Sequence, residues 1–314
     1  MSDRDPRADS PVVTGGGAPD PVHELLESRS FLVGDGTEVR RLLPQRRLRS
    51  LGAWCFADHY GPDDVLASEG MQVPPHPHTG LQTVSWLLEG AIVHRDSLGS
   101  LQRVEARELS LMTSGQGISH SEESPAQDRP PTLFGVQLWV ALPEAARHGA
   151  PSYEHHADLP VVEHGALTAT VVLGEHAGRT SPGTTFSRLV GLDVLVAGDG
   201  VLPLEEGFEH GAFVLDGSAV VDGQPVEVGE LVHLGCGRTE LSLSGASSRV
   251  MVLGGEPLEE RLVMWWNFVC RTGEEVAQAR ADWEDGDRFG TVLGYPGDRL
   301  SAPPLGPARL LPRS

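Results

Sequence analysis

Two short segments carry histidines at a spacing that suits metal binding. His76 and His78 are separated by one proline, and on an extended strand this spacing puts both imidazoles on the same face. His120 and Glu122 are separated by one serine, so an imidazole and a carboxylate have the same relation after a glycine-rich turn. If the two segments lie side by side in a barrel, we expect the four side chains to converge on one metal ion.

Either pair alone is weak evidence of a site, because a histidine beside proline in a polar loop is commonly a surface residue without a binding role, and a His-x-Glu triplet occurs readily by chance. The two pairs gain weight because they share one unit of a faint internal repeat. In this repeat, Leu87–Gly90 resembles Val214–Gly217, and Glu108–Gly115 resembles Glu230–Gly237. The second unit lacks the set, since the corresponding positions fall near Pro203, Glu205, Ser242 and Ser244. We therefore predict one metal per chain, in the first unit.

The donor set is typical of a functional metal site rather than a structural one. Three neutral imidazoles and one carboxylate suit Fe2+, Mn2+, Co2+, Ni2+, Cu2+ or Zn2+, and the affinity order gives little selectivity among them. An octahedral ion with these ligands keeps two positions open for substrate or O2, whereas a structural zinc site is closed and commonly rich in cysteine. The cysteines support neither a zinc ribbon nor a disulfide scaffold, because they are far apart and lack C-x-x-C spacing: Cys55, Cys236 and Cys270.

The elements that must position these residues are predicted to be strands. Short apolar segments recur between Gly, Pro and Asp residues, which favours an all-β sandwich or barrel. Apolar residues alternate through Phe134–Val140, so we expect one face of this strand to be buried. One helix is predicted, because Thr272 and Glu275 form a capping box and apolar residues then recur at helical spacing to about Glu284.

The composition is that of a soluble globular protein. Of the 314 residues, 39% are hydrophobic and 22% charged, and the mean hydropathy is -0.17. No run approaches the roughly 20 apolar residues of a membrane span, and no signal peptide or presequence pattern is present, so we expect a cytoplasmic protein without membrane contact. With 24 basic and 44 acidic residues the formal net charge is -20, which disfavours direct nucleic-acid binding.

Five separated motifs, in order, resemble the pirin family of bicupins. They are Phe56–Pro62, His76–Gly80, His94–Gly99, Met112–Glu122 and Gln137–Val140. This match spans about residues 30–142, and a looser match follows from Leu253–Leu258 into the predicted helix. The order and separation of the motifs make the resemblance specific.

The resemblance implies two tandem cupin barrels, a bicupin, with an accessory C-terminal α-helix. It also implies a single mononuclear iron in the N-terminal barrel, with His76, His78, His120 and Glu122 as ligands, all of which match the family motif. The expected division is a flexible tail over 1–22, a metal-binding cupin over 23–146, a linker over 147–165, a second cupin without metal ligands over 166–290, and a C-terminal tail over 291–314.

Two alternative functions follow from the resemblance. Several bacterial pirins are dioxygenases that cleave quercetin or related flavonols with O2, and here Glu122 would take the hydroxyl proton of a substrate coordinated by the metal, most simply Fe2+. Other pirins are non-catalytic iron or redox sensors that modulate a protein partner, as transcription cofactors or enzyme regulators. Both functions need the same four ligands. We favour the enzyme, acting as a monomer.

Two residues near the motifs have simpler interpretations. His94, beside Arg95 and Asp96, is expected to be hydrogen-bonded structure rather than a fifth ligand. Gln82 stands where the family often has glutamate, so we expect it to weaken any carboxylate support of the metal-binding histidines.

Overall fold

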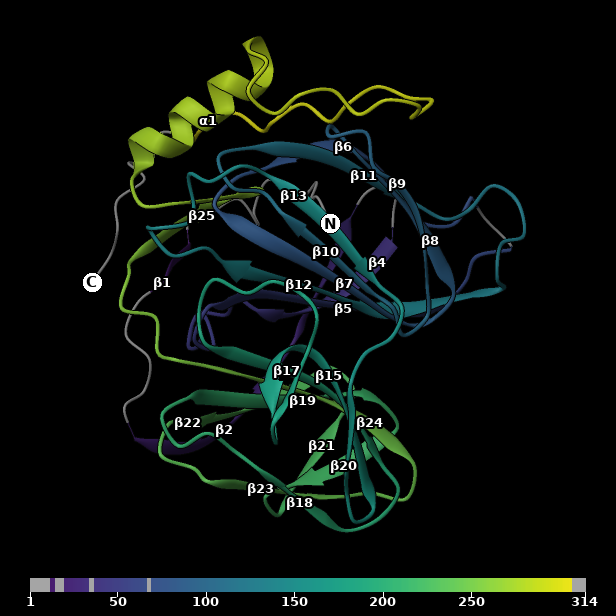
Figure 1. Cartoon of the computed structure of the whole chain (residues 1–314), viewed down its shortest axis with the longest axis vertical. Coiled ribbons are helices and arrows are strands. Elements are labelled where there is room, and N and C mark those ends of the chain that lie inside the picture. Colours follow the sequence, from purple (N-terminus) through teal and green to yellow (C-terminus); the bar gives the residue numbers. More distant parts are fainter. Residues whose placement is uncertain (1–11, 15–19, 34–36, 67–68, 307–314) are drawn as a thin grey trace.

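The chain forms two β-barrels that pack against each other, with a helix at one end (Figure 1). The computed structural model describes residues 12–14, 20–33, 37–66 and 69–306. The barrel from the first half of the chain lies beside the helix, α1 (Gly273–Asp285), and the other barrel lies at the far end of the molecule (Figure 1). The predicted all-β class, with two tandem barrels and an accessory C-terminal helix, is confirmed.

The first barrel consists of a larger and a smaller antiparallel sheet. The larger sheet contains, in order across it, β13 (Ser152–His156), β10 (Leu109–Thr113), β7 (Leu81–Glu89), β12 (Thr132–Ala141), β5 (Trp54–Asp64), β4 (Thr37–Leu43) and β3 (Arg29–Val33). The smaller sheet contains β6 (Gln72–His78), β11 (Ile118–Glu123), β8 (Ala91–Asp96) and β9 (Leu101–Glu105).

The second barrel repeats this arrangement, as the internal repeat predicts. Its larger sheet contains, in the same order, β2 (Pro21–Glu27), β22 (Glu230–Gly235), β19 (Glu209–Asp216), β24 (Ser248–Gly255), β17 (Leu189–Val196), β15 (Leu167–His176) and β14 (Val161–His164), and β16 (Arg179–Thr180) pairs with β15. Its smaller sheet contains β18 (Gly200–Pro203), β23 (Glu240–Ser244), β20 (Ser218–Val221) and β21 (Gln224–Glu227). A third sheet is formed by β1 (Val12–Thr14), β25 (Leu262–Trp265) and β26 (Phe268–Cys270).

The two barrels exchange edge strands. β2 lies directly before the strands of the first barrel in sequence but pairs with β22 of the second, so that Leu26 is opposite Leu231. β13 lies directly before the strands of the second barrel but pairs with β10 of the first, so that Tyr153 is opposite Met112. The first strand of each sequence repeat therefore completes the sheet of the other barrel.

This exchange differs from the expected division of the chain. The segment from residue 23 onward is predicted to start the first cupin, yet Pro21–Glu27 is part of the second barrel's sheet. The predicted linker contains β13 and β14, one strand for each barrel. Much of the predicted N-terminal tail, namely 1–11 and 15–19, lies outside the described residues, as do residues 307–314 of the C-terminal tail. The domain boundaries themselves stay a prediction.

A shared apolar core joins the two barrels. The buried face predicted for Phe134–Val140 lies in this core together with Phe213 and Leu253 of the second barrel. The indole N–H of Trp54 on β5 reaches across and donates to the carbonyl oxygens of Val190 and Gly254, at 3.2 and 3.1 Å. Because successive side chains of a strand alternate, the opposite face of β12 points into the first barrel, toward the candidate site.

The predicted helix is present as α1, within a residue or two of its expected bounds. The Thr272 hydroxyl caps its first turn by accepting from the backbone N–H of Glu275 at 3.2 Å, and the Glu275 carboxylate accepts from the backbone N–H of Arg271. Val276 and Trp283 are buried on its inner face. In the described part of the chain no helix is long and apolar enough to cross a membrane.

Candidate metal centre

The predicted histidines meet inside the first barrel because β6 and β11 are neighbouring antiparallel strands. His76 is directly opposite His120, and His78 is opposite Ile118. All three imidazoles are at most 1% exposed. The Nε2 atoms of His78 and His120 are 3.1 Å apart, and the rings of His76 and His120 have centroids 4.4 Å apart. One ligand atom from each of the three lies within 4.8 Å of the others, which is close enough for all three to hold one ion.

The imidazoles are held in the neutral form that metals bind. Nδ1 of His76 lies 2.8 Å from the carbonyl oxygen of Pro74, so this nitrogen carries the proton and donates it. Nε2 of His76 is buried and has no hydrogen-bond partner among the described residues. Burial lowers the pKa of His76 to about 3 and holds the pKa values of His78 and His120 well below the usual value. Protons therefore compete little with a metal near neutral pH.

Acid is expected to destabilise the metal-free protein through these imidazoles. Their pKa values are lower in the folded than in the unfolded chain, so the unfolded chain binds more protons at any pH below about 6.5. The free energy of unfolding should be largest above about pH 6.5 and should fall toward about pH 4, by up to about 1.4 kcal/mol per pH unit for each imidazole. Urea unfolding of chelator-treated protein at about pH 7.5, 6 and 5 measures this dependence, and a flat or rising profile toward acid would contradict it.

The predicted fourth ligand, Glu122, lies beside His120, but its carboxylate belongs to a second set of possible metal ligands. A β-bulge between His120 and Glu122 shifts the pairing with β6, so that Glu122 is opposite Val73. Its carboxylate groups with the imidazoles of His120 and His94, the three ligand atoms lying within 4.8 Å of one another. Glu122 is 1% exposed, and its Oε2 has no partner among the described residues. That all four residues bind one metal stays a prediction.

Ser85 and Gln137, which the sequence analysis missed, orient Glu122. The Ser85 hydroxyl donates to Oε1 of Glu122 at 2.6 Å. Ser85 Oγ also lies 2.9 Å from the side-chain amide of Gln137, its partner across β7 and β12. Since the hydroxyl has only one proton, we assign the amide so that its N–H donates to Ser85. One carboxylate oxygen of Glu122 is thus fixed, and the other is free for a metal or a substrate proton.

His94 supports His120 from the side opposite His78. His94 is hydrogen-bonded, since its Nε2 lies 3.2 Å from Oδ2 of Asp96, which also accepts two backbone N–H groups through Oδ1. That it is structural rather than a fifth ligand stays a prediction, because its imidazole also lies within reach of an ion held by His120 and Glu122. In addition, Nδ1 of His94 lies 3.4 Å from Nδ1 of His120. The ring of Tyr153 stacks on His94 with centroids 4.1 Å apart. With its Nε2–H donated to Asp96, His94 can accept the Nδ1 proton of His120 and leave Nε2 of His120 free.

Replacing His94 with phenylalanine is expected to weaken metal binding about 10- to 100-fold. The phenyl ring keeps the stacking on Tyr153 but removes the acceptor for the Nδ1 proton of His120. Titration of the metal-free protein with Co2+ gives both the affinity and the absorption bands of the bound ion. His155→Phe, a half-buried histidine on β13 paired with Glu108, is the matched control. Equal Co2+ affinity and spectra in the two variants would contradict a role for His94 in holding His120.

Gln82 does not support the histidines. Its amide N–H groups donate to the Thr113 hydroxyl at 2.9 Å and to the carbonyl oxygen of Thr184 at 3.0 Å. The expectation that Gln82 weakens carboxylate support of an imidazole stays a prediction, since the described contacts of this side chain are to threonine residues and its Oε1 has no partner among the described residues. The support comes from His94 and Asp96, on β8.

Comparison with known proteins identifies the family. The pirin family model matches residues 36–140, and the model of the pirin C-terminal cupin domain matches residues 192–290. A Pseudomonas aeruginosa protein with the provisional name quercetin 2,3-dioxygenase is 42% identical over 90% of this chain and 90% of its own. A pirin-like protein of Caulobacter vibrioides is 37% identical over 79% of this chain and 88% of its own.

A solved structure supports the same conclusion. The crystal structure of quercetin 2,3-dioxygenase from Acinetobacter baumannii matches with a TM-score of 0.87 and 42% identity, covering 91% of this chain and 96% of that one. The two barrels are therefore cupin barrels, as the sequence motifs imply. The chain belongs to the pirin family.

Proposed function

We propose that the protein is a metal-dependent dioxygenase that cleaves flavonols such as quercetin with O2, using one divalent metal, most simply Fe2+. The observation that carries this proposal is the group of three buried neutral imidazoles, His76, His78 and His120, beside a carboxylate with one unpartnered oxygen. Orphaned buried polar atoms at His76 and Glu122 fit a metal, because such atoms are otherwise hydrogen-bonded in native proteins. The names of two similar proteins support the substrate class.

The residues around the metal would have separate roles in the reaction. When bound, the metal would supply open coordination positions that bring the substrate oxygens and O2 together. Glu122 Oε2 would accept the hydroxyl proton of the flavonol, while Ser85 holds Oε1 and so keeps the carboxylate aimed. Trp139 lies edge-on against His78, with centroids 5.2 Å apart, and stacks on Phe56. These rings are buried and pack beside the imidazoles.

A second candidate function is a non-catalytic iron or redox sensor that modulates a protein partner. The four side chains are each at most 1% exposed, and this burial favours the alternative. A metal enclosed in this way would affect a protein partner by changing the conformation of the surrounding barrel, without contact with a substrate. Both functions use His76, His78, His120 and Glu122. They differ in whether a substrate reaches the metal.

The test is flavonol turnover by the iron-loaded protein, followed by O2 uptake and loss of flavonol absorbance over a panel of flavonols. We expect turnover that depends on metal loading, with one metal per chain by elemental analysis. Protein loaded with Mn2+, Co2+ or Ni2+ serves to identify the active metal. Absence of turnover with every flavonol and metal would favour the sensor, and two tightly held metals per chain would contradict the single site.

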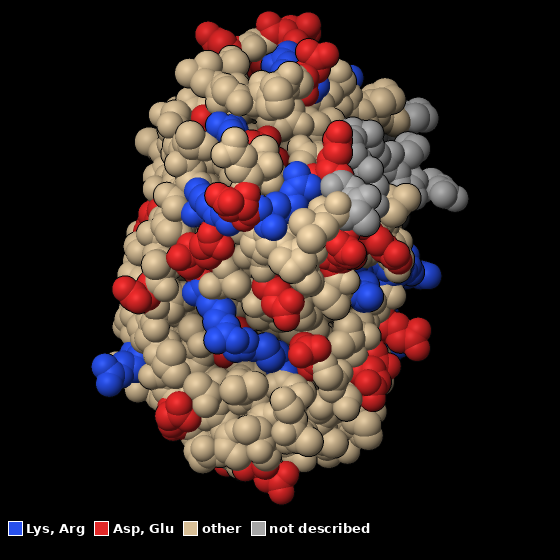
Figure 2. Space-filling view, turned by 90° about the vertical axis from the view of Figure 1, so that its right-hand side faces the viewer, with Lys and Arg blue, Asp and Glu red and all other residues tan. Residues whose placement is uncertain are grey.

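We also propose a cytoplasmic monomer without direct nucleic-acid contact. On the face shown in Figure 2, basic and acidic side chains are interspersed and no continuous basic band is visible. Together with the net charge of -20, this leaves little to replace the counterions of a phosphate backbone. A sequence-specific gel shift with the purified protein alone at physiological salt would contradict this proposal.

A further inference from the structure

The two strands that carry the candidate ligands are covered from outside by the C-terminal part of the chain. α1 and the segment 286–300 that follows it lie across the end of the first barrel, next to β6 (Figure 1). The backbone N–H of Leu300 donates to the carbonyl oxygen of Pro75 at 2.9 Å, and the Ser119 hydroxyl donates to the carbonyl oxygen of Gly290 at 3.3 Å. Each of these contacts is made one residue before a candidate ligand.

Arg288, in this segment, joins the end of β6 to the beginning of β11. Its Nε donates to the carbonyl oxygen of Gln116 at 2.7 Å, and its Nη2 donates to the Thr79 hydroxyl at 3.1 Å. Thr79 directly follows His78, and Gln116 lies two residues before β11. The Thr79 hydroxyl is itself 3.1 Å from the same carbonyl oxygen. The guanidinium therefore completes a triangle of hydrogen bonds that fixes the separation of the two ligand strands at this end.

Arg288 is itself held in place by α1 and by the apolar cluster beneath the segment. Its Nη1 donates to Oδ2 of Asp282 at 3.0 Å. The next residue, Phe289, is 2% exposed and stacks on Phe268 with ring centroids 5.6 Å apart. Gly117 packs so closely that a Cβ at this position would lie 3.1 Å from the Phe289 ring and 3.3 Å from the side chain of Arg288. The glycine-rich turn before β11 is thus shaped to receive the C-terminal segment.

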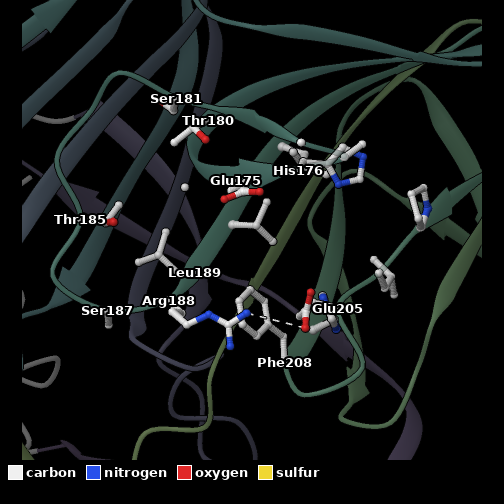
Figure 3. A pocket seen from close by; sticks show the side chains of 18 of the residues that line it. Glu175, His176, Thr180, Ser181, Thr185, Ser187, Arg188, Leu189, Glu205 and Phe208 are labelled. Atoms are coloured by element: carbon white, nitrogen blue, oxygen red, sulfur yellow. Dashed lines mark ion pairs between the residues drawn. The ribbon is translucent and has the colours of Figure 1, made fainter.

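The corresponding strands of the second barrel, which lacks the ligand set, are left open. The common strand order makes β18 and β23 the counterparts of β6 and β11. All six residues of β11 are buried, whereas exposed and buried residues alternate along β23. The connection that follows β18 borders an open hollow of about 490 Å3, where Figure 3 shows Phe208 and Glu205, the latter paired with Arg188. In the described part of the chain, the outer layer therefore covers the barrel that carries the candidate ligands.

We infer that Arg288 is a positioning residue of the metal centre, which holds His78 and His120 at the separation that one ion requires. Side chains that are already in place need no rearrangement of their strands when the ion binds, so the affinity is higher. By thermodynamic linkage, a contact that strengthens metal binding is strengthened by the metal to the same extent. The inference rests on the metal site of the proposed function, and it does not depend on flavonol turnover.

Titration of the metal-free, full-length protein with Co2+ tests the inference. Arg288→Met removes the N–H donors and keeps a long side chain, and we expect it to lower the Co2+ affinity roughly 10-fold and to shift the absorption bands of the bound ion. Arg280→Met is the matched control, because Arg280 ties α1 to the carbonyl oxygen of Pro303 and has no described contact with the ligand strands. Its Co2+ affinity and spectrum should equal those of wild type.

Hydrogen exchange gives a second readout that needs no spectrum of the ion. Loading the protein with Co2+ should slow amide exchange in the peptide 286–300, because the metal strengthens the contacts of this segment with the ligand strands. In Arg288→Met the slowing should be much smaller. Neither measurement uses a flavonol, so a failure of the proposed reaction leaves both results unchanged.

Two outcomes would overturn the inference. They are equal Co2+ affinity and spectra in Arg288→Met and Arg280→Met, and equal exchange of the peptide 286–300 with and without Co2+. Arg288→Lys keeps the test decisive even if Arg288→Met does not fold. Lysine retains the charge beside Asp282 but lacks the planar fork that reaches Gln116 and Thr79 together, so its Co2+ affinity should also fall below that of Arg280→Met.

Discussion

Replacing Glu122 with glutamine is expected to lower flavonol turnover per bound iron by roughly 10²- to 10⁴-fold, while most of the metal stays bound. Glutamine has the same size and keeps an oxygen that can accept from Ser85 or contact the metal. It has no carboxylate to take up the hydroxyl proton. Turnover should therefore fall far more than iron content, which separates the role of a base from that of a ligand.

The neighbouring residue supplies a matched control for this experiment. Glu123→Gln makes the same chemical change one position along β11, where the side chain pairs with Arg95 at 2.7 Å instead of facing the imidazoles. Flavonol consumption and iron content are measured side by side for wild type and both variants. Unchanged turnover per iron in Glu122→Gln would remove Glu122 from the mechanism, and a loss explained entirely by lost iron would make it a ligand only.

Replacing His76 with alanine is expected to abolish tight metal binding, a loss of at least about 100-fold in affinity, while leaving the protein folded. The substitution removes one of three converging imidazoles, and the hydrogen bond it breaks among the described residues is that of Nδ1 to the Pro74 carbonyl, since Nε2 has no partner there. The stability of the barrels comes mainly from the apolar core between them and the core inside the second barrel.

Elemental analysis and calorimetry measure the two parts of this prediction. The control is His148→Ala, at a surface histidine whose side chain is 62% exposed. We expect His76→Ala to contain almost no iron after reconstitution and to melt cooperatively, whereas His148→Ala should match wild type in both respects. Full iron content in His76→Ala would contradict the assignment of His76 as a ligand, and an unfolded variant would show that the site also maintains the barrel.

The sequence was enough to place the histidines but not the groups that orient them. The alternation of side chains along a strand puts His76 and His78 on one face, and the motif order places His120 on a strand of the same barrel. The position of Glu122 depends on a β-bulge, which changes cross-strand register without a clear sequence signal. Ser85 and Gln137 meet only because β7 and β12 pair in one particular register.

The exchange of edge strands could not be predicted for a similar reason. Residues 21–27 have the composition of an ordinary strand, and nothing in them specifies which of two equivalent sheets they join. The internal repeat does predict two copies of one unit. A repeat in sequence, however, gives the order of strands along the chain and leaves open which copies pair in space.

The exchange also sets an order of events during synthesis. β2 leaves the ribosome before any strand of the first barrel, yet its partner β22 is made only after that barrel is complete. The nascent chain must therefore carry an unpaired strand through most of its translation, which invites pairing with other chains. Pro21, Glu24 and Glu27 are residues of the kinds that discourage such pairing, and they keep the strand available until its own sheet is ready.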